Sequence, residues 1–65
     1  MRIEIEREDD GRWLGEVPSL PGVLAYGATA EGARTKAEAL AFRVIADRLE
    51  NGETIPPEAH QLFAA

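Results

Sequence analysis

The sequence predicts an α+β fold in which a small three-stranded antiparallel sheet packs on one long helix, with the chain order strand, strand, strand, helix. Three observations support this prediction: isoleucine alternates with glutamate over residues 3–6, a segment rich in proline and glycine follows at 18–22, and residues 30–50 carry apolar side chains at helical spacing. The 65 residues form one domain, 1–65, near the lower size limit at which a chain folds alone.

The first predicted strand has one apolar and one acidic face, as in a half-buried antiparallel strand. Its alternating residues are Ile3, Glu4, Ile5, Glu6 and Glu8. A three-residue hairpin loop, 9–11, sets Ile5 opposite Gly15, whereas a two-residue loop would mix apolar and charged residues on one face. The three-residue loop is therefore predicted, with Gly11 in the left-handed conformation. This register gathers Ile3, Ile5, Trp13 and Val17 on one face.

Gly15 falls in the middle of the second strand on its buried face, where a glycine weakens a strand unless a neighbour needs the space. The helix backbone and the Trp13 side chain are the two candidates. For the third strand, residues 23–28, two alternatives remain: Leu24 and Tyr26 are partly exposed, or they face the core. If exposed, these two side chains form a candidate contact patch.

Thr29 is placed to cap a helix that runs to about Glu50 and ends at Asn51-Gly52. The expected core stripe of this helix consists of Ala30, Ala33, Ala37, Leu40, Ala41, Val44 and Ile45. Four more apolar residues lie off the stripe: Ala39, Phe42, Ala46 and Leu49. For the phenylalanine, a cover over the sheet edge and an oligomer contact are the alternatives.

Residues 51–65 are predicted to be a connector and a C-terminal arm, without a separate DNA-binding domain. Glycine and proline favour an exposed connector over 51–59. The remaining residues, 60–65, are open to three forms: a short fourth strand, a helical turn, or an arm that docks on another chain. The candidate oligomer contacts are Phe42, Leu49, Leu62 and Phe63.

Composition limits the classes of partner. Seven basic against twelve acidic residues give a net charge of −5, which repels phosphate backbones and favours a basic partner. The absence of cysteine excludes disulfides and thiolate metal sites, and makes a reducing cytoplasm the simplest location. No apolar run approaches the roughly 20 residues that span a bilayer, so no membrane association is expected.

The sequence predicts no enzyme, no cofactor and no metal site. His60 is the only histidine and has no serine or cysteine nearby that would suit a catalytic triad. The spacings typical of zinc proteases, dinucleotide sites and phosphate-binding loops are absent. Glu4, Glu6 and Glu16 share the outer face of the predicted sheet, where a solvated acidic face and a metal-binding group are the two interpretations.

Most of the chain resembles the HicB-like antitoxins of type II toxin–antitoxin systems. The resemblance is carried by the run from Asp10 to Gly22, by Tyr26-Gly27-Ala28-Thr29, and by later segments at 36–49 and 52–56. Its motif residues are Trp13, Pro18, Leu20, Pro21, Gly22, Gly27 and Thr29. The resemblance implies a partial RNase H-like β-β-β-α unit, often with a fourth strand, that lacks working nuclease carboxylates.

The resemblance also implies a function. Members of this family neutralise HicA, a small basic toxin that cleaves mRNA, by masking its RNA-binding and catalytic surface, and a homo-oligomer (dimer or tetramer) is expected. Many members carry a C-terminal DNA-binding segment that these 65 residues lack, so operator binding is not expected of this chain. The alternatives are a free-standing oligomeric binding module and a residual metal-dependent nuclease that uses Glu4, Glu6 or Glu16.

Overall fold

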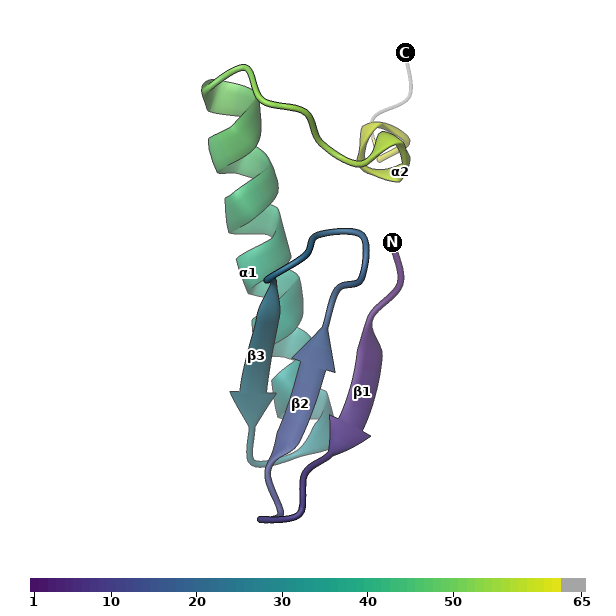
Figure 1. The fold of residues 1–65 in the computed structure, drawn as a ribbon, viewed down its shortest axis with the longest axis vertical. Helices are drawn as coiled ribbons and strands as arrows, with labels where there is room; N and C mark the ends of the chain where they lie inside the picture. Colours follow the sequence, from purple (N-terminus) through teal and green to yellow (C-terminus); the bar gives the residue numbers. More distant parts are fainter. Residues whose placement is uncertain (63–65) are drawn as a thin grey trace.

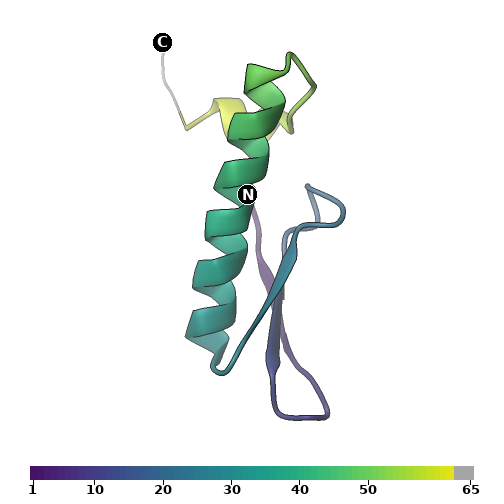
Figure 2. The same cartoon turned by 90° about the vertical axis from the view of Figure 1, so that its left-hand side faces the viewer.

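A three-stranded antiparallel sheet and a long helix form the two layers of the protein in a computed structural model, which describes residues 1–62 (Figure 1). The elements are β1 (Glu4–Arg7), β2 (Trp13–Glu16), β3 (Leu24–Gly27), α1 (Ala30–Glu50) and α2 (Pro57–His60). The strand order is β1-β2-β3, and α1 covers one face of the sheet and leaves the other open (Figure 2). The predicted α+β fold and its chain order are confirmed.

The first hairpin has the predicted register. Ile5 lies opposite Gly15. The Glu8 N–H donates to the Arg12 carbonyl at 2.7 Å, which leaves the predicted three residues in the loop. Gly11, in that loop, has a φ of +90°, a conformation that residues with a Cβ rarely adopt. Local sequence is enough to set this hairpin, because alternation and the Asp-Gly turn both favour the same register.

The second turn joins β2 to β3 and places one large side chain in the centre of the core. The Val17 N–H donates to the Val23 carbonyl at 3.0 Å, and the Leu20 N–H donates to the Val17 carbonyl at 2.9 Å. Leu20 is fully buried and Val17 is 1% exposed. The turn therefore does more than reverse the chain, since it supplies the two most deeply buried large side chains of the described residues.

Two glycines allow α1 to lie directly on the sheet. A Cβ at Gly15 would lie 2.8 Å from the Ala33 carbonyl oxygen, and one at Gly27 would overlap the Ala33 backbone nitrogen. Real Cβ atoms do not approach backbone atoms this closely, because repulsion rises steeply below about 3.5 Å. Of the two explanations for Gly15, the helix backbone is therefore correct. The glycines weaken the strands locally but permit close packing of the two layers.

The helix has the predicted bounds and buried stripe. The Thr29 hydroxyl oxygen accepts a hydrogen bond from the Gly32 N–H at 2.9 Å and so caps the N-terminus. The C-terminus is followed by Gly52 with a φ of +68°. The buried residues of α1 are Ala33, Ala37, Ala41 and Ile45, all from the predicted stripe. No helix within residues 1–62 is both long enough and apolar enough to cross a membrane.

The prediction of an exposed connector over 51–59 is wrong in part. Ile55 is 6% exposed and Ala59 is 3% exposed, and both belong to the main hydrophobic core. The reason is geometric: α1 extends beyond the end of the sheet, and the returning chain packs against that part of the helix (Figure 1). The Ser19 hydroxyl donates to Glu58 Oε1 at 2.5 Å and connects this segment to the second turn.

The C-terminal segment forms a short helix in place of the fourth strand. Pro57 is the first residue of α2, a position that suits a residue without an N–H. Because proline cannot donate to a strand ladder, the Pro56-Pro57 pair also opposes strand pairing at this point. Within residues 1–62 the sheet has three strands. Phe63, a candidate oligomer contact, lies outside the described residues.

Candidate binding surface

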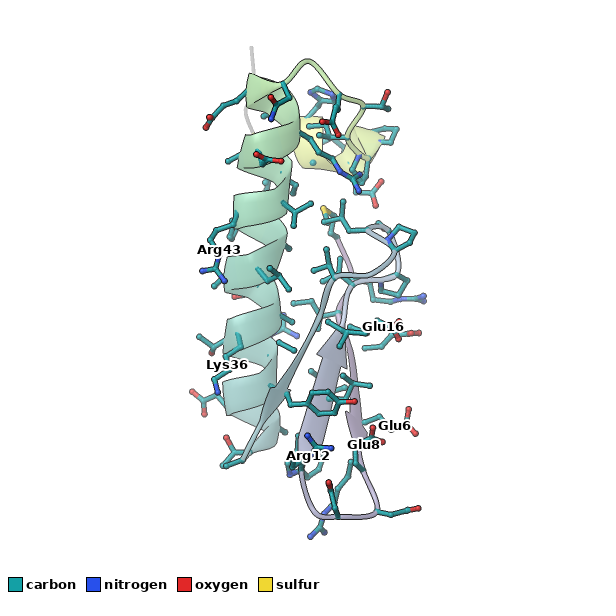
Figure 3. The ribbon with its side chains drawn as sticks, turned by 60° about the vertical axis from the view of Figure 1, so that its left-hand side comes forward. Glu6, Glu8, Arg12, Glu16, Lys36 and Arg43 are labelled. Atoms are coloured by element: carbon teal, nitrogen blue, oxygen red, sulfur yellow. The ribbon has the colours of Figure 1, made fainter. Side chains whose placement is uncertain are left out.

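The face of the sheet that is turned away from α1 carries acidic and apolar side chains next to one another. Gly15 and Ala25 point towards α1, so their alternate neighbours project to the other side. We call this surface the outer face; its residues are Glu4, Glu6, Glu8, Leu14, Glu16, Leu24 and Tyr26. Figure 3 shows Glu6, Glu8 and Glu16 on the side of the sheet away from the helix.

The outer face has an apolar half on β2 and β3. Leu14 pairs with Tyr26 across the two strands. Leu24 is 39% exposed and Tyr26 is 38% exposed, whereas Val23 is buried in the core. The alternative in which Leu24 and Tyr26 form an exposed patch is therefore confirmed. Sequence reasoning missed Leu14 as a third member, although its alternation with the buried Gly15 would have placed it there.

The acidic half of the outer face lies on β1 and β2. Glu4 lies directly opposite Glu16 across the strand pair. Like charges in this position are destabilising, so the arrangement does not serve stability. Arg2 approaches Glu4 at 3.3 Å, but both side chains are more than half exposed and such pairs contribute little. Within residues 1–62, no salt bridge reaches Glu6 or Glu16.

Arg12 lies at the end of the outer face that is next to the first hairpin loop. Its guanidinium lies 4.2 Å from the centre of the Tyr26 ring, in cation–π geometry. Its Nε also contacts Asp10 Oδ2 at 2.7 Å. Hydrogen bonds from the Arg12 backbone N–H and side chain lower the pKa of Asp10 below its ordinary value. Asp10 therefore partly neutralises this cation, and Arg12 holds the tyrosine ring against the sheet.

Charge is distributed unevenly between the two layers. The glutamates of the outer face lie on one side of the molecule, whereas Lys36 and Arg43 project from the side of α1 away from the sheet (Figure 3). Acidic residues also occur on α1, and Glu38 lies 3.7 Å from Arg34. The helix surface is thus of mixed charge, and the outer face is predominantly negative.

The residues considered for catalysis do not converge. In the described part of the chain, no three histidine, aspartate or glutamate side chains are close enough together to hold a metal ion. Glu4 and Glu16 are cross-strand neighbours, but a third carboxylate does not complete the group. His60 lies on α2 and borders a hollow with Leu49 and Ile55.

The motif residues of the resemblance have structural positions. Leu20 is in the core, Gly27 contacts the helix backbone, and Thr29 caps α1. Gly22 has a φ of +90°, and the prolines at 18 and 21 are exposed in the same turn. Trp13 is half-buried, with the Arg7 guanidinium 5.9 Å from its ring centre. These residues shape the scaffold and leave the outer face to other side chains.

A second apolar surface occurs where α1 and α2 meet. Phe42 and Leu62 are each 58% exposed, and Leu49 is 51% exposed. They border two neighbouring hollows of about 180 and 220 Å³. The three described candidate oligomer contacts therefore lie near one another, although Phe42 and Leu49 belong to α1 and Leu62 follows the end of α2.

A comparison with known protein families, with curated proteins and with solved structures found no match for this chain.

Proposed function

We propose that this protein is an antitoxin that binds a small basic RNA-cleaving toxin of the HicA type and masks its RNA-binding and catalytic surface. The observation that carries the proposal is the outer face, a surface that combines four glutamates with three adjacent apolar side chains. The motif run from Asp10 to Gly22 supports it through its resemblance to HicB-like antitoxins. The proposal describes a non-catalytic protein that acts in the cytoplasm, where mRNA is found.

The physical argument starts from what an RNA-cleaving toxin must present. A surface that binds RNA is basic, because most of its affinity comes from neutralising phosphates. An acidic surface of similar extent attracts such a toxin over long range and competes with its RNA. The pair formed by Glu4 and Glu16 is suited to a cationic side chain placed between the two carboxylates, which would also relieve their repulsion.

The apolar half of the outer face provides affinity that charge alone does not. Leu24 and Tyr26 are each more than one third exposed to solvent. Burial of this apolar surface on binding is favourable. Tyrosine is enriched among the residues that dominate binding energy in protein interfaces. Arg12 pre-orders the Tyr26 ring, so less conformational entropy is lost when a partner covers it.

The decisive experiment is co-expression with a small basic RNA-cleaving toxin of the HicA type. We expect rescue of growth from its toxicity and recovery of a stable complex. Glu16→Arg should weaken the complex at least roughly tenfold, because it places a cation against a basic partner. Glu53→Arg is the matched control, since it changes net charge equally at an exposed site on the connector, and its effect should be below roughly threefold.

Three outcomes would contradict the proposal. The absence of both complex and rescue would favour a free-standing binding module. Equal weakening by Glu16→Arg and Glu53→Arg would mean that net charge, and not the outer face, governs binding. Magnesium- or manganese-dependent RNA cleavage by this chain, lost in Glu16→Ala, would indicate the nuclease alternative.

A further inference from the structure

Strand β1 lies at one edge of the sheet, and within residues 1–62 it has a neighbouring strand on one side only. The Glu8 N–H donates to the Arg12 carbonyl, so Glu8 and every second residue before it bond to β2. The intervening residues, Ile5 and Arg7, therefore point their N–H and C=O groups away from the sheet. We call these backbone groups the free edge, because unpaired donors and acceptors on an edge strand are available to another chain.

The pairing of β2 with β3 supports this assignment independently. The Val17 N–H donates to the Val23 carbonyl at 3.0 Å, so Val17 and every second residue before it bond to β3. Gly15 and Trp13 are among these residues, and they are the two that lie opposite the free edge. Their backbone groups point to β3, which leaves the free edge without a partner on β2.

The two edges of the sheet differ in how far α1 covers them. Figure 1 shows α1 along the β3 side of the sheet, with β1 at the opposite side. A Cβ at Gly27 in β3 would overlap the Ala33 backbone nitrogen, so the helix lies directly against that strand. In contrast, Ile5 on β1 and its neighbour Trp13 remain half-buried. Strand β1 is therefore the more open edge, with partly exposed apolar surface beside it.

We propose that β1 binds an extended segment of a partner protein as an added antiparallel strand, and that basic and apolar residues alternate along this segment. In strand addition, main-chain hydrogen bonds provide affinity and alternate side chains provide specificity. The antiparallel orientation is expected because it is slightly more stable per residue than the parallel one. It also continues the pattern of the existing sheet.

The outer face of β1 specifies the basic residues of the partner. Glu4, Glu6 and Glu8 occupy every second position, and Figure 3 shows the last two on the side away from α1. Side chains directly opposite each other on paired strands attract when their charges differ. Arg2 lies 3.3 Å from Glu4, but within residues 1–62 no salt bridge reaches the other two glutamates. Lysine or arginine at alternate positions of the added strand would face these carboxylates.

The helix-facing side of β1 specifies the apolar residues of the partner. Ile3, just before the strand, packs partly against the core, and Ile5 is half-buried. Apolar side chains of an added strand would cover both isoleucines, which is favourable. Arg7 lies on the same side, with its guanidinium 5.9 Å from the centre of the Trp13 ring. A basic residue of the partner on this side would meet that cation, so only one phase of the alternation fits.

The same alternation disfavours a second copy of β1 as the added strand. If two β1 strands pair with their apolar sides matched, glutamates lie opposite glutamates, because they occupy every second position. Like charges in this arrangement are destabilising, and charged side chains commonly protect edge strands from self-association. The free edge therefore selects a strand of opposite charge.

This inference goes beyond the antitoxin proposal and does not depend on it. A toxin that binds the outer face need not add a strand to β1, and a basic strand can come from a protein that is not a toxin. The tests use synthetic peptides and no toxin, so their failure would leave the co-expression result standing.

The first test uses a short synthetic peptide in which lysine and valine alternate. We expect it to bind and to slow the amide hydrogen exchange of Ile5 and Arg7, because their N–H groups become paired. The amides of Leu24 and Tyr26 on the opposite edge should exchange as before. The control peptide has the same composition with its lysines and valines in separate blocks, and it should bind at least roughly tenfold more weakly. Equal binding of the two peptides would mean that charge alone attracts them and would overturn the proposal.

The second test separates main-chain pairing from side-chain contact by methylating peptide nitrogens. In the proposed antiparallel arrangement, the valine N–H groups bond to β1 and the lysine N–H groups point to solvent. Methylation of the valine nitrogens should therefore weaken binding at least roughly tenfold, and methylation of the lysine nitrogens should change it less than roughly threefold. Equal binding of the two methylated peptides would overturn strand addition.

The third test changes the free edge itself. Arg7→Pro removes one outward N–H, and proline is tolerated on an edge strand where its nitrogen faces solvent. Arg7→Ala is the matched control, because it removes the same exposed side chain and keeps the N–H. We expect the first variant to weaken binding of the alternating peptide at least roughly tenfold and the second less than roughly threefold.

Urea unfolding of both variants shows whether the fold is kept. If Arg7→Pro does not fold, the methylated peptides still test the proposal on the natural chain. Equal peptide binding by folded Arg7→Pro and Arg7→Ala would overturn the assignment to β1. Slowed exchange at Leu24 and Tyr26 in place of Ile5 and Arg7 would overturn it as well.

Discussion

Replacement of Gly27 by alanine should destabilise the fold by about 2 kcal/mol, because the new methyl group would meet the backbone of α1. The added Cβ would overlap the Ala33 nitrogen and lie 2.8 Å from the Gly32 carbonyl carbon. None of these atoms belongs to a flexible side chain, so α1 must move away from β3 to make room. Overpacking of this kind costs about 1–3 kcal/mol, and a rigid backbone obstacle places Gly27 near the upper end.

One opposing effect reduces the expected loss. Alanine restricts the unfolded chain more than glycine does, which favours the folded state by about 0.4–1 kcal/mol. Subtracting this from a cost near 3 kcal/mol leaves about 2 kcal/mol. Proteins of this length are stable by roughly 3–10 kcal/mol, so the change is a large share of the total. A loss of this size is easily resolved by urea unfolding.

Gly32→Ala is the matched control, two residues into the same helix. Its Cβ would lie 3.1 Å from the Thr29 hydroxyl oxygen, which is a side-chain atom with some freedom to move. Alanine is also favoured over glycine inside a helix by about 1 kcal/mol. We therefore expect no loss of stability, and a small gain if the cap is kept.

The assay is urea unfolding followed by circular dichroism at one fixed protein concentration, because self-association would raise the midpoint at higher concentration. A Gly27→Ala variant with the same midpoint and slope as the natural chain would refute close packing of α1 on β3. An equal loss in Gly32→Ala would mean that glycine flexibility, and not contact, is the cause.

Three further variants, with Leu24→Ala as the control for the first, test the core, the cap and the C-terminal segment by the same urea assay. Leu20→Ala should cost about 2–5 kcal/mol because the side chain is fully buried, and Leu24→Ala, 39% exposed, should cost less than about 1 kcal/mol. Thr29→Ala should cost about 1 kcal/mol through loss of the N-terminal cap. The Ser19 hydrogen bond lowers the pKa of Glu58, so its stabilisation is present above the ordinary carboxyl range, about pH 4, and is lost as pH falls through the lowered pKa. Ser19→Ala should therefore reduce the acid-induced fall in stability.

For each of these three variants, one outcome would contradict the prediction. If Leu20→Ala and Leu24→Ala lowered the free energy of unfolding equally, Leu20 of the second turn would not be a core residue. An unchanged urea midpoint in Thr29→Ala would show that the Thr29 side chain does not stabilise the N-terminus of α1. If Ser19→Ala shifted the urea midpoint equally at neutral and acid pH, the hydrogen bond would not couple stability to protonation of Glu58.

Much of the candidate surface follows from alternation along the first two strands. Glu4 and Glu16 were predicted on the outer face because a period of two leaves one side of a strand polar. The apolar half was not decided in this way, since a four-residue strand such as β3 is too short for its pattern to choose a face. Packing against α1 determines which face of β3 is buried. The position of Arg12 over Tyr26 was missed, because it joins a hairpin loop to a strand that the chain reaches after a second turn.

The sequence by itself determined the features that depend on near neighbours. The hairpin register, the cap at Thr29, the end of α1 before Gly52 and the buried stripe each result from residues a few positions apart, whose geometry is the same in any fold. Only the tertiary structure decided where segments far apart in the chain meet. It assigned Gly15 to contact with the helix backbone, and it brought Ile55 into the core as cover for the part of α1 beyond the sheet. Such contacts depend on the shape of the assembled layers, which no short stretch of sequence encodes.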